Sequence, residues 1–250
     1  SLCAVISHLH ATLPALDPVF SPLAHLGIQD IYCLGDVVGY GPWPEECVDL
    51  VMERCRWTLK GNHDEGMLTG AMHDFNPLAR ESLMWTRKRM KPGFFSPRKK
   101  KRWQYLEAAP SRVDQDGFAF VHASPRDPIR EYVLKSDGFL DPEKMEENFS
   151  LIEGPCFNGH THQPGFTTSD FRFHQASPDR LVWDLPKDPC IINVGSVGQP
   201  RDGDPRSCFL VVDDGKLLYQ RVDYDIQRTQ KEILIQRMSP YLAERLVHGR

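Results

Sequence analysis

Cys33-Leu34-Gly35-Asp36-Val37-Val38-Gly39-Tyr40-Gly41-Pro42 is the stretch of sequence that decides the fold. The apolar residues 31–34 predict a short buried strand that ends at Gly35. Asp36 therefore follows the carboxyl end of a strand, where α/β folds place their binding sites. The glycines and the proline that follow predict a tight loop with few side chains, which leaves the space above Asp36 open.

Four other junctions between a predicted strand and a loop bring His or Asn side chains. These junctions are Ser7-His8-Leu9-His10, Gly61-Asn62-His63-Asp64, Val121-His122-Ala123-Ser124-Pro125 and Gly159-His160-Thr161-His162. They contain six of the ten histidines of the chain, a concentration that scattering by chance does not explain. Because strand ends can meet at one edge of a sheet, the sequence predicts that the five junctions form one site.

The junctions supply oxygen and nitrogen ligands for metal ions but no thiolates. Two histidines two residues apart on an extended backbone point the same way, as a metal site requires, although an isolated pair of this kind is more often one buried and one exposed side chain. The seven ligands exceed the needs of one tetrahedral site and suit two adjacent ions bridged by a carboxylate. The candidate ligands are His8, His10, Asp36, Asn62, His122, His160 and His162.

Two neighbours of Asn62 could take part in catalysis. His63 offers a titratable imidazole, and Asp64 is a carboxylate able to orient that imidazole. The same three residues are also a good turn followed by a helix cap, so a purely structural role stays open.

Length and composition predict one α/β domain over residues 1–250. The chain has 40% hydrophobic and 26% charged residues, which is ordinary for a globular protein. No apolar run approaches the ~18 residues of a membrane span, so no membrane partner is expected. The seven cysteines are odd in number and lack C-x-x-C spacing, which favours reduced thiols and a cytoplasmic location.

The net charge of −4 hides a local excess of basic residues. Residues 80–102 contain ten basic residues and one acid, so this segment carries +9 and the remainder −4 − 9 = −13. Such a patch could contact a polyanion. A solvated face of two surface helices is the simpler interpretation and the one we favour.

The remaining pattern predicts alternating helices and short strands without internal repeats. Pro18 and Pro22 predict a broken helix within residues 13–26. Further helices are expected over 44–54, in several pieces within 65–107, over 141–152, from 225, and from 240. Further strands are expected at 2–6, 57–59, 118–121, 171–173, 181–183, 190–194, 208–212 and 216–222.

The order of these motifs resembles the calcineurin-like metallophosphoesterase family, in the small bacterial branch related to diadenosine tetraphosphatases and serine/threonine phosphatases. The resemblance extends from residue 2 to about residue 222. It rests on H-x-H where D-x-H is usual, then Gly-Asp-x-x-Gly, Gly-Asn-His-Asp, a lone His and Gly-His-Thr-His. Three further stretches strengthen it: residues 39–42, residues 122–126, and Asn193-Val194-Gly195-Ser196-Val197-Gly198-Gln199-Pro200-Arg201.

The resemblance implies a fold of two facing mixed β-sheets flanked by helices, with the site at the carboxyl ends of strands. By position in the motifs, His8, His10, Asp36 and His162 hold the first metal ion. Asp36 bridges to a second ion, which Asn62, His122 and His160 complete. His63 then faces the leaving-group oxygen as a general acid with Asp64 behind it. Arg126 and Arg201 are either phosphate contacts or structural ion pairs.

His8 departs from the family, whose first ligand is normally aspartate. Extra imidazole favours iron or zinc at this position, and the two transition-metal ions are expected to be iron, zinc or manganese. A degenerate site is the other interpretation. A histidine-containing barrel is rejected because eight regular βα units are not visible and two of the motifs would then have no role.

The sequence therefore predicts a metal-dependent phosphoesterase, a hydrolase with a dinuclear centre and a bridging hydroxide. It would cleave a phosphodiester or a phosphomonoester, of which we favour the diester, in a small molecule or a phosphorylated or nucleotide substrate. No obligate nucleic-acid partner is expected. The alternative is a binding or scaffold protein that keeps the fold but has reduced catalysis.

Overall fold

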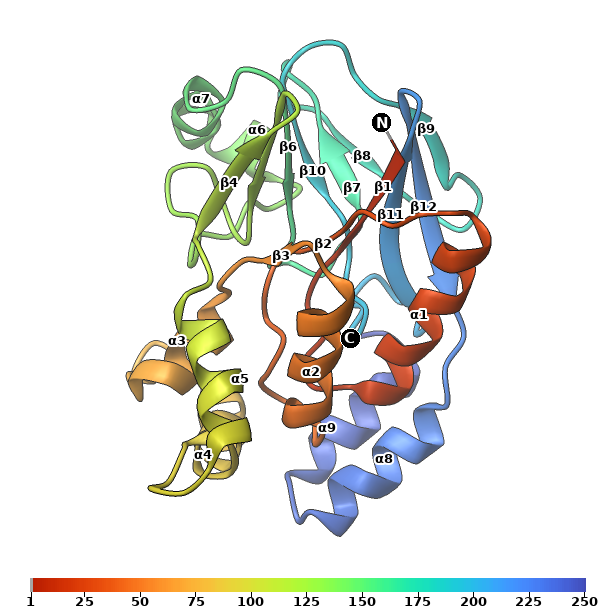
Figure 1. Ribbon diagram of the computed structural model, residues 1–250. Helices are drawn as coiled ribbons and strands as arrows, with labels where there is room; N and C mark the ends of the chain where they lie inside the picture. Colours follow the sequence, from red (N-terminus) through yellow and green to blue (C-terminus); the bar gives the residue numbers. More distant parts are fainter. Residues whose placement is uncertain (1) are drawn as a thin grey trace.

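Two six-stranded sheets form the centre of the computed structural model, which describes residues 2–250 (Figure 1). The first sheet has the order β3 (Trp57–Thr58), β2 (Ile31–Cys33), β1 (Leu2–Ile6), β11 (Ser207–Asp213), β12 (Lys216–Val222) and β9 (Val182–Asp184). The second has the order β4 (Arg112–Gln115), β5 (Phe118–Val121), β6 (Pro155–Asn158), β10 (Cys190–Asn193), β7 (Gly165–Thr167) and β8 (Phe173–Gln175).

Both sheets are mixed, and their parallel strands determine where the loops meet. In the first sheet β1, β2 and β3 are parallel to one another, while β11 runs antiparallel to β1. In the second sheet β5, β6 and β10 are parallel. The predicted architecture of two mixed sheets is confirmed, and the carboxyl ends of each parallel set lie at one edge of their sheet.

Successive side chains of β1 point to opposite faces of the sheet and belong to two different parts of the hydrophobic core. Cys3 and Val5 join the apolar cluster between the two sheets, whereas Ala4 and Ile6 join the cluster under the helices. The strand is buried on both faces, so it reads as a continuous apolar run. Between the sheets the rings of Phe120 and Phe157 stack with centroids 5.2 Å apart.

Helices cover the outer faces of both sheets and extend below the first (Figure 1). Side chains of α1 (Leu13–His25) and α2 (Pro44–Arg54) pack on the first sheet, and Met145 of α7 (Pro142–Ser150) packs on the second. The other helices are α3 (Asn62–Thr69), α4 (Pro77–Met90), α5 (Pro97–Glu107), α6 (Asp137–Leu140), α8 (Ile226–Ile235), α9 (Pro240–Glu244) and the 3₁₀ helix η1 (Arg245–His248). None of the helices within residues 2–250 has the length and apolar character needed to cross a bilayer.

The expected break in the first helix is wrong. Helix α1 is continuous although Pro18 and Pro22 lie inside it. Both prolines are only partly buried, so water can satisfy the carbonyl oxygens that lose an amide donor. The buried residues Leu16, Val19 and Leu23 of the same helix are anchored in the core, and this packing outweighs the cost of the prolines.

Two short strands are shifted from their predicted positions. Strand β8 begins at Phe173 rather than at residue 171, because Phe171 has a left-handed backbone and its amide closes a turn onto the carbonyl of Thr168 at 2.8 Å. Strand β9 begins at Val182, one residue later than expected. Both are three-residue strands at the ends of their sheets, where periodicity gives little information.

The basic segment 80–102 forms most of α4 and the first half of α5, as expected. Part of its charge is matched by acids of α2, since Arg89 pairs with Glu45 and Arg102 with Asp49, each at 2.8 Å. These pairs agree with the interpretation of the segment as a solvated helical face.

Candidate metal centre

The side chain of Asp36 is the point at which the strand ends converge. Its Oδ2 atom lies 3.4 Å from His122 Nε2, 3.6 Å from His8 Nε2 and 3.7 Å from His10 Nε2. These four residues come from the junctions after β1, β2 and β5, and all are at most 1% exposed. One carboxylate oxygen is therefore shared by three histidines from both sheets.

The other predicted ligands complete the same cluster. His162 Nε2 is 3.4 Å from His10 Nε2, and Asn62 Oδ1 is 3.1 Å from His122 Nε2. The ring of His160 lies 5.1 Å from the ring of His122, centroid to centroid. All seven candidate ligands are thus close together at one edge of the sandwich.

Main-chain carbonyls fix the ring orientation of four of these histidines. A carbonyl oxygen accepts a hydrogen bond from one ring nitrogen, which leaves the other nitrogen with its lone pair toward the cluster. The bonds are His10 Nδ1 to Val38 O (3.3 Å), His122 Nδ1 to Leu34 O (2.8 Å), His162 Nδ1 to Gln199 O (2.6 Å) and His160 Nε2 to Arg130 O (2.8 Å). This is the arrangement that metal-binding histidines need.

His8 is held differently from the others. Its Nδ1 is 2.6 Å from Ser7 Oγ, and its Nε2 accepts the main-chain N–H of His160 at 2.9 Å. Both ring nitrogens are therefore engaged, and the Nε2 lone pair must be released before it can bind a metal ion. His8 falls into one group of candidate ligands with His122 and His160, whereas His10 groups with Asp36 and His63.

Burial keeps most of the imidazoles neutral. It lowers the pKa of His8, His10 and His162 well below 6.5, and that of His160 to about 3. His122 is the exception: burial lowers its pKa, but the charge of Asp36 outweighs this effect and raises it. Neutral imidazoles with free lone pairs are the protonation state that divalent metal ions require.

Asp36 remains charged although it is buried. Burial alone would raise the pKa of its carboxyl group, but the neighbouring His122 and His63 hold it well below its usual value. The site therefore combines one carboxylate with an excess of neutral nitrogen ligands. The 3.4–3.7 Å separations around Oδ2 are too long for good hydrogen bonds. They fit ligands that share an ion through bonds of ~2.0–2.2 Å.

The backbone at the site is strained. Left-handed φ values, between 46° and 69°, occur at five of the expected ligands: His8, His10, Asp36, His160 and His162. For a residue with a side chain this conformation costs ~1–2 kcal/mol. Strain gathered on the ligand loops indicates that the fold positions these side chains for function.

Asp64 does not orient His63, contrary to our expectation. Its two carboxylate oxygens accept hydrogen bonds of 2.8–3.2 Å from main-chain N–H groups. The donors are the amides of Asp36, Val37, Val38 and Gly61. Burial and the charge of Asp36 raise the pKa of Asp64 to about 7, while its amide donors act in the opposite direction. Asp64 therefore shapes the loop that carries Asp36.

Asp64→Ala should destabilise the protein and empty the metal site. The substitution leaves four amides without their acceptor, and each unsatisfied buried group costs ~1–3 kcal/mol. We expect a loss of at least ~3 kcal/mol in thermal unfolding together with loss of bound metal. His63→Ala is the matched control. His63 is next to Asp64 in the sequence, but its buried Nδ1 makes no hydrogen bond. Full metal content in Asp64→Ala would contradict the positioning role.

His63 lies beside the cluster with one ring nitrogen buried. Its Nδ1 has no hydrogen-bond partner and faces Gly39, where a Cβ atom would come within 2.3 Å of it. Burial lowers the pKa of His63 to about 4. Nε2, the ring nitrogen not packed against Gly39, is therefore the one left to contact a ligand. The backbone N–H of His63 donates to Asp36 Oδ1 at 2.9 Å.

The two candidate phosphate contacts have different surroundings. The guanidinium of Arg126 forms ion pairs with Glu131 at 2.6 Å and with Glu147 at 2.7 Å. Of the two expected roles, Arg126 therefore has that of a structural ion pair. Arg201 makes its side-chain hydrogen bonds to Gln199 and lies in the wall of a cavity together with Tyr132 and Thr161.

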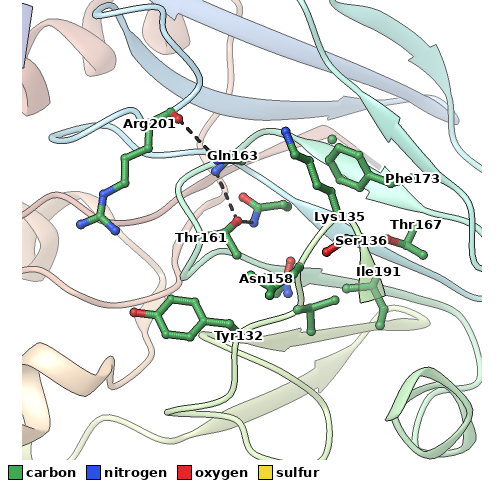
Figure 2. A pocket seen from close by; sticks show the side chains of 14 residues that line it. Tyr132, Lys135, Ser136, Asn158, Thr161, Gln163, Thr167, Phe173, Ile191 and Arg201 are labelled. Atoms are coloured by element: carbon green, nitrogen blue, oxygen red, sulfur yellow. Dashed lines mark hydrogen bonds between the residues drawn. The ribbon is translucent and has the colours of Figure 1, made fainter. Parts of the chain in front are cut away.

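Two cavities that share Tyr132 lie near the histidine cluster, and only the second is lined by candidate metal ligands. The first, ≈ 350 Å³, is shown in Figure 2 with Tyr132, Asn158, Thr161 and Arg201 around it. The second, ≈ 440 Å³, is lined by Asn62, His63, His160 and other residues. Tyr132 borders both, and its ring stacks on His160 with centroids 3.8 Å apart.

Sequence reasoning missed Tyr132, Tyr40 and Arg245. Tyr132 belongs to an irregular loop without a motif, and Tyr40 was noted only as part of a turn. The ring of Tyr40 contacts those of His10 and His63, at 4.9 and 4.6 Å between centroids. Arg245 lies near the C-terminal end of the sequence, after the last of the motifs. Nothing local in the sequence marks these three residues.

Comparison with known proteins agrees with this geometry. An uncharacterized protein of Methanocaldococcus jannaschii is 34% identical over 258 aligned positions, covering 100% of this chain and 99% of the relative. A crystal structure of a metallophosphoesterase from Sphaerobacter thermophilus is 34% identical, with a TM-score of 0.84 and full coverage of both chains. A hypothetical protein from Pyrococcus horikoshii shares the fold at 17% identity, with a TM-score of 0.75 over 100% of this chain and 98% of the other.

The family model for the calcineurin-like phosphoesterase superfamily domain matches residues 2–215. This range contains all seven candidate ligands together with His63, Arg126 and Arg201. The resemblance inferred from the motifs is confirmed, and the chain belongs to the calcineurin-like phosphoesterase superfamily.

Proposed function

We propose that this protein is a phosphoesterase with a dinuclear metal centre that hydrolyses phosphodiesters in preference to monoesters. The observation that carries the proposal is the position of Asp36 Oδ2, which lies within 3.7 Å of Nε2 atoms from three histidines. A carboxylate oxygen surrounded in this way is suited to bridge two cations.

The residues present fit such a pair of ions. His10 and His162 would hold one ion, and His8 would join them once it releases the amide of His160. Asn62, His122 and His160 would hold the other ion, with Asp36 between the two. When bound, two divalent ions polarise a phosphoryl group and lower the pKa of an attacking water. Iron, zinc and manganese suit this set of nitrogen and oxygen ligands.

Two cavities support the preference for diesters. A diester carries a substituent on each side of the phosphorus. One cavity is lined by Asn62, His63 and His160, and the other meets it at Tyr132. In its imidazolium form, which a bound phosphate anion favours, His63 can donate a proton from Nε2 to the leaving oxygen. A monoester would fill only one cavity.

The test is metal analysis combined with hydrolysis of bis(p-nitrophenyl) phosphate and p-nitrophenyl phosphate. We expect two equivalents of metal per chain and faster hydrolysis of the diester. A metal-free protein without activity toward either ester would instead support a binding or scaffold protein of this fold. The engagement of both His8 nitrogens is the one observation that favours that second function.

His8→Asp should change the metal preference of the site. Imidazole adds no charge at this position, whereas aspartate adds one negative charge and an oxygen ligand. We expect the native protein to bind iron or zinc and the variant to bind manganese relatively more tightly. Metal analysis after equilibration with an equimolar mixture measures this shift. A first site that is empty in the native protein and filled only in His8→Asp would show that His8 marks a degenerate site.

Neutralising Lys99, Lys100 and Lys101 tests whether the basic segment gathers substrate. If it does, the triple Lys→Gln variant should have a lower association rate for a polyanionic ester and a weaker dependence of that rate on salt. Stopped-flow measurements at low and high salt check this. Equal rates at low salt would leave α5 as a solvated helix without a role in binding.

A further inference from the structure

Arg245 is a buried charged residue that the proposed chemistry leaves unused. It begins η1 at the end of the chain and is 8% exposed. This C-terminal segment lies beyond residues 2–215, the range that matches the family model. Any role of Arg245 at the site therefore comes from outside the range matched by the family model.

The guanidinium of Arg245 lacks an anionic partner. Within residues 2–250 it forms no ion pair, and its Nε and Nη2 atoms are buried without a hydrogen-bond acceptor. Arg221 provides the internal comparison, because its side chain is 2% exposed and is paired with Asp202 and Asp204. Burying an unpaired charge is costly, so a buried arginine normally has such a partner.

Arg245 lies next to the histidine cluster through Tyr40. Its guanidinium carbon is 4.5 Å from the centre of the Tyr40 ring. The same ring packs edge-on against His10 at 4.9 Å and against His63 at 4.6 Å. The cation–π contact holds the guanidinium beside the site without neutralising it.

A second unpaired guanidinium lies in the same region. Arg201 forms no ion pair within the described part of the chain and bonds only to Gln199 through its side chain. The main-chain N–H of Arg201 donates to the carbonyl of His162 at 3.2 Å, and Gln199 accepts a hydrogen bond from His162 Nδ1. Two guanidinium groups without a carboxylate partner therefore lie beside the histidine cluster.

We propose that Arg245 and Arg201 bind the phosphoryl oxygens of the substrate, so that the C-terminal helix η1 (Arg245–His248) contributes to the substrate site. This inference rests on the proposed phosphoesterase function. Guanidinium groups bind phosphate oxygens through paired N–H donors. The phosphate charge would supply the partner that Arg245 lacks, in a buried environment where the interaction is strong.

The test compares Arg245→Gln and Arg245→Lys with the control Arg228→Gln in the metal-loaded protein. Arg228 belongs to α8, which also lies beyond residue 215, and its guanidinium lies over an aromatic ring, that of Trp43, at 5.4 Å. We expect Arg245→Gln to raise KM for bis(p-nitrophenyl) phosphate and Ki for inorganic phosphate by roughly 10- to 100-fold. Arg245→Lys should restore part of this loss, and the control should leave both constants unchanged.

Thermal unfolding separates binding from a structural role. Because Arg245→Gln removes an unpaired buried charge, its Tm without phosphate should equal or exceed that of the native protein. A lower Tm with unchanged Ki would overturn the inference and leave Arg245 as a brace for Tyr40. If the native protein hydrolyses no ester, the proposed function fails. Calorimetric phosphate binding that is lost in Arg245→Gln would then still support the anion site, and binding retained in it would overturn that site.

Discussion

Asp36→Asn should abolish turnover while the protein remains folded. The substitution removes the one anionic ligand that three histidines share, and with it several kcal/mol of charge stabilisation in the transition state. At ~1.4 kcal/mol for each factor of ten, this corresponds to a loss of roughly 10³-fold or more in kcat. The amide side chain keeps its oxygen toward the N–H of His63, so the loop should retain its shape.

Activity, metal content and circular dichroism of the same preparation check this result. Asp114→Asn is the matched control, since it removes a carboxylate that pairs with Arg112 on the edge strand β4. Native activity in Asp36→Asn would contradict the assignment of Asp36 as the shared ligand. Loss of activity together with global unfolding would show a structural defect instead.

His63→Ala should slow substrates with poor leaving groups by ~10²–10⁴-fold and nitrophenyl esters far less. The difference arises because only a poor leaving oxygen needs a proton as its bond to phosphorus breaks. Both metal ions should remain, because the side chain lies beside the proposed ligands rather than among them. Loss of metal in the variant would mean that His63 is a ligand, as its grouping with His10 and Asp36 permits.

The pH dependence provides a second check on His63. In the free enzyme burial lowers the pKa of His63 to about 4. The pH profile of kcat/KM should therefore show no titration of this group between pH 6 and 8. A bound phosphate anion favours the imidazolium form and raises the pKa in the complex. A general acid must be protonated, so kcat should fall as the pH rises through this higher value. The fall should be absent in His63→Ala.

The sequence predicted the convergence of the site because each motif follows a strand. Alternating polar and apolar runs placed Asp36, His122 and the paired histidines at strand ends, and parallel pairing brings such ends to one edge. The order of the motifs then identified the family. These features depend on local spacing, which a single sequence carries.

The hydrogen bonds within the site could not be predicted from the sequence. The acceptor role of Asp64 depends on amides up to 28 residues away, and His8 is held by an amide 152 residues away. The spacing of motifs along the sequence predicts which side chains come near one another. Which of two nearby groups forms the hydrogen bond depends on differences of tenths of an ångström in tertiary packing. Arg245 is the extreme case, since only tertiary structure places it on Tyr40.

Anomalous X-ray diffraction from crystals of the metal-loaded protein tests the central claim most directly. The account predicts two anomalous peaks ~3.5–4 Å apart on either side of Asp36 Oδ2, with His10 and His162 at one and Asn62, His122 and His160 at the other. A single peak, or peaks that do not share Asp36, would contradict it.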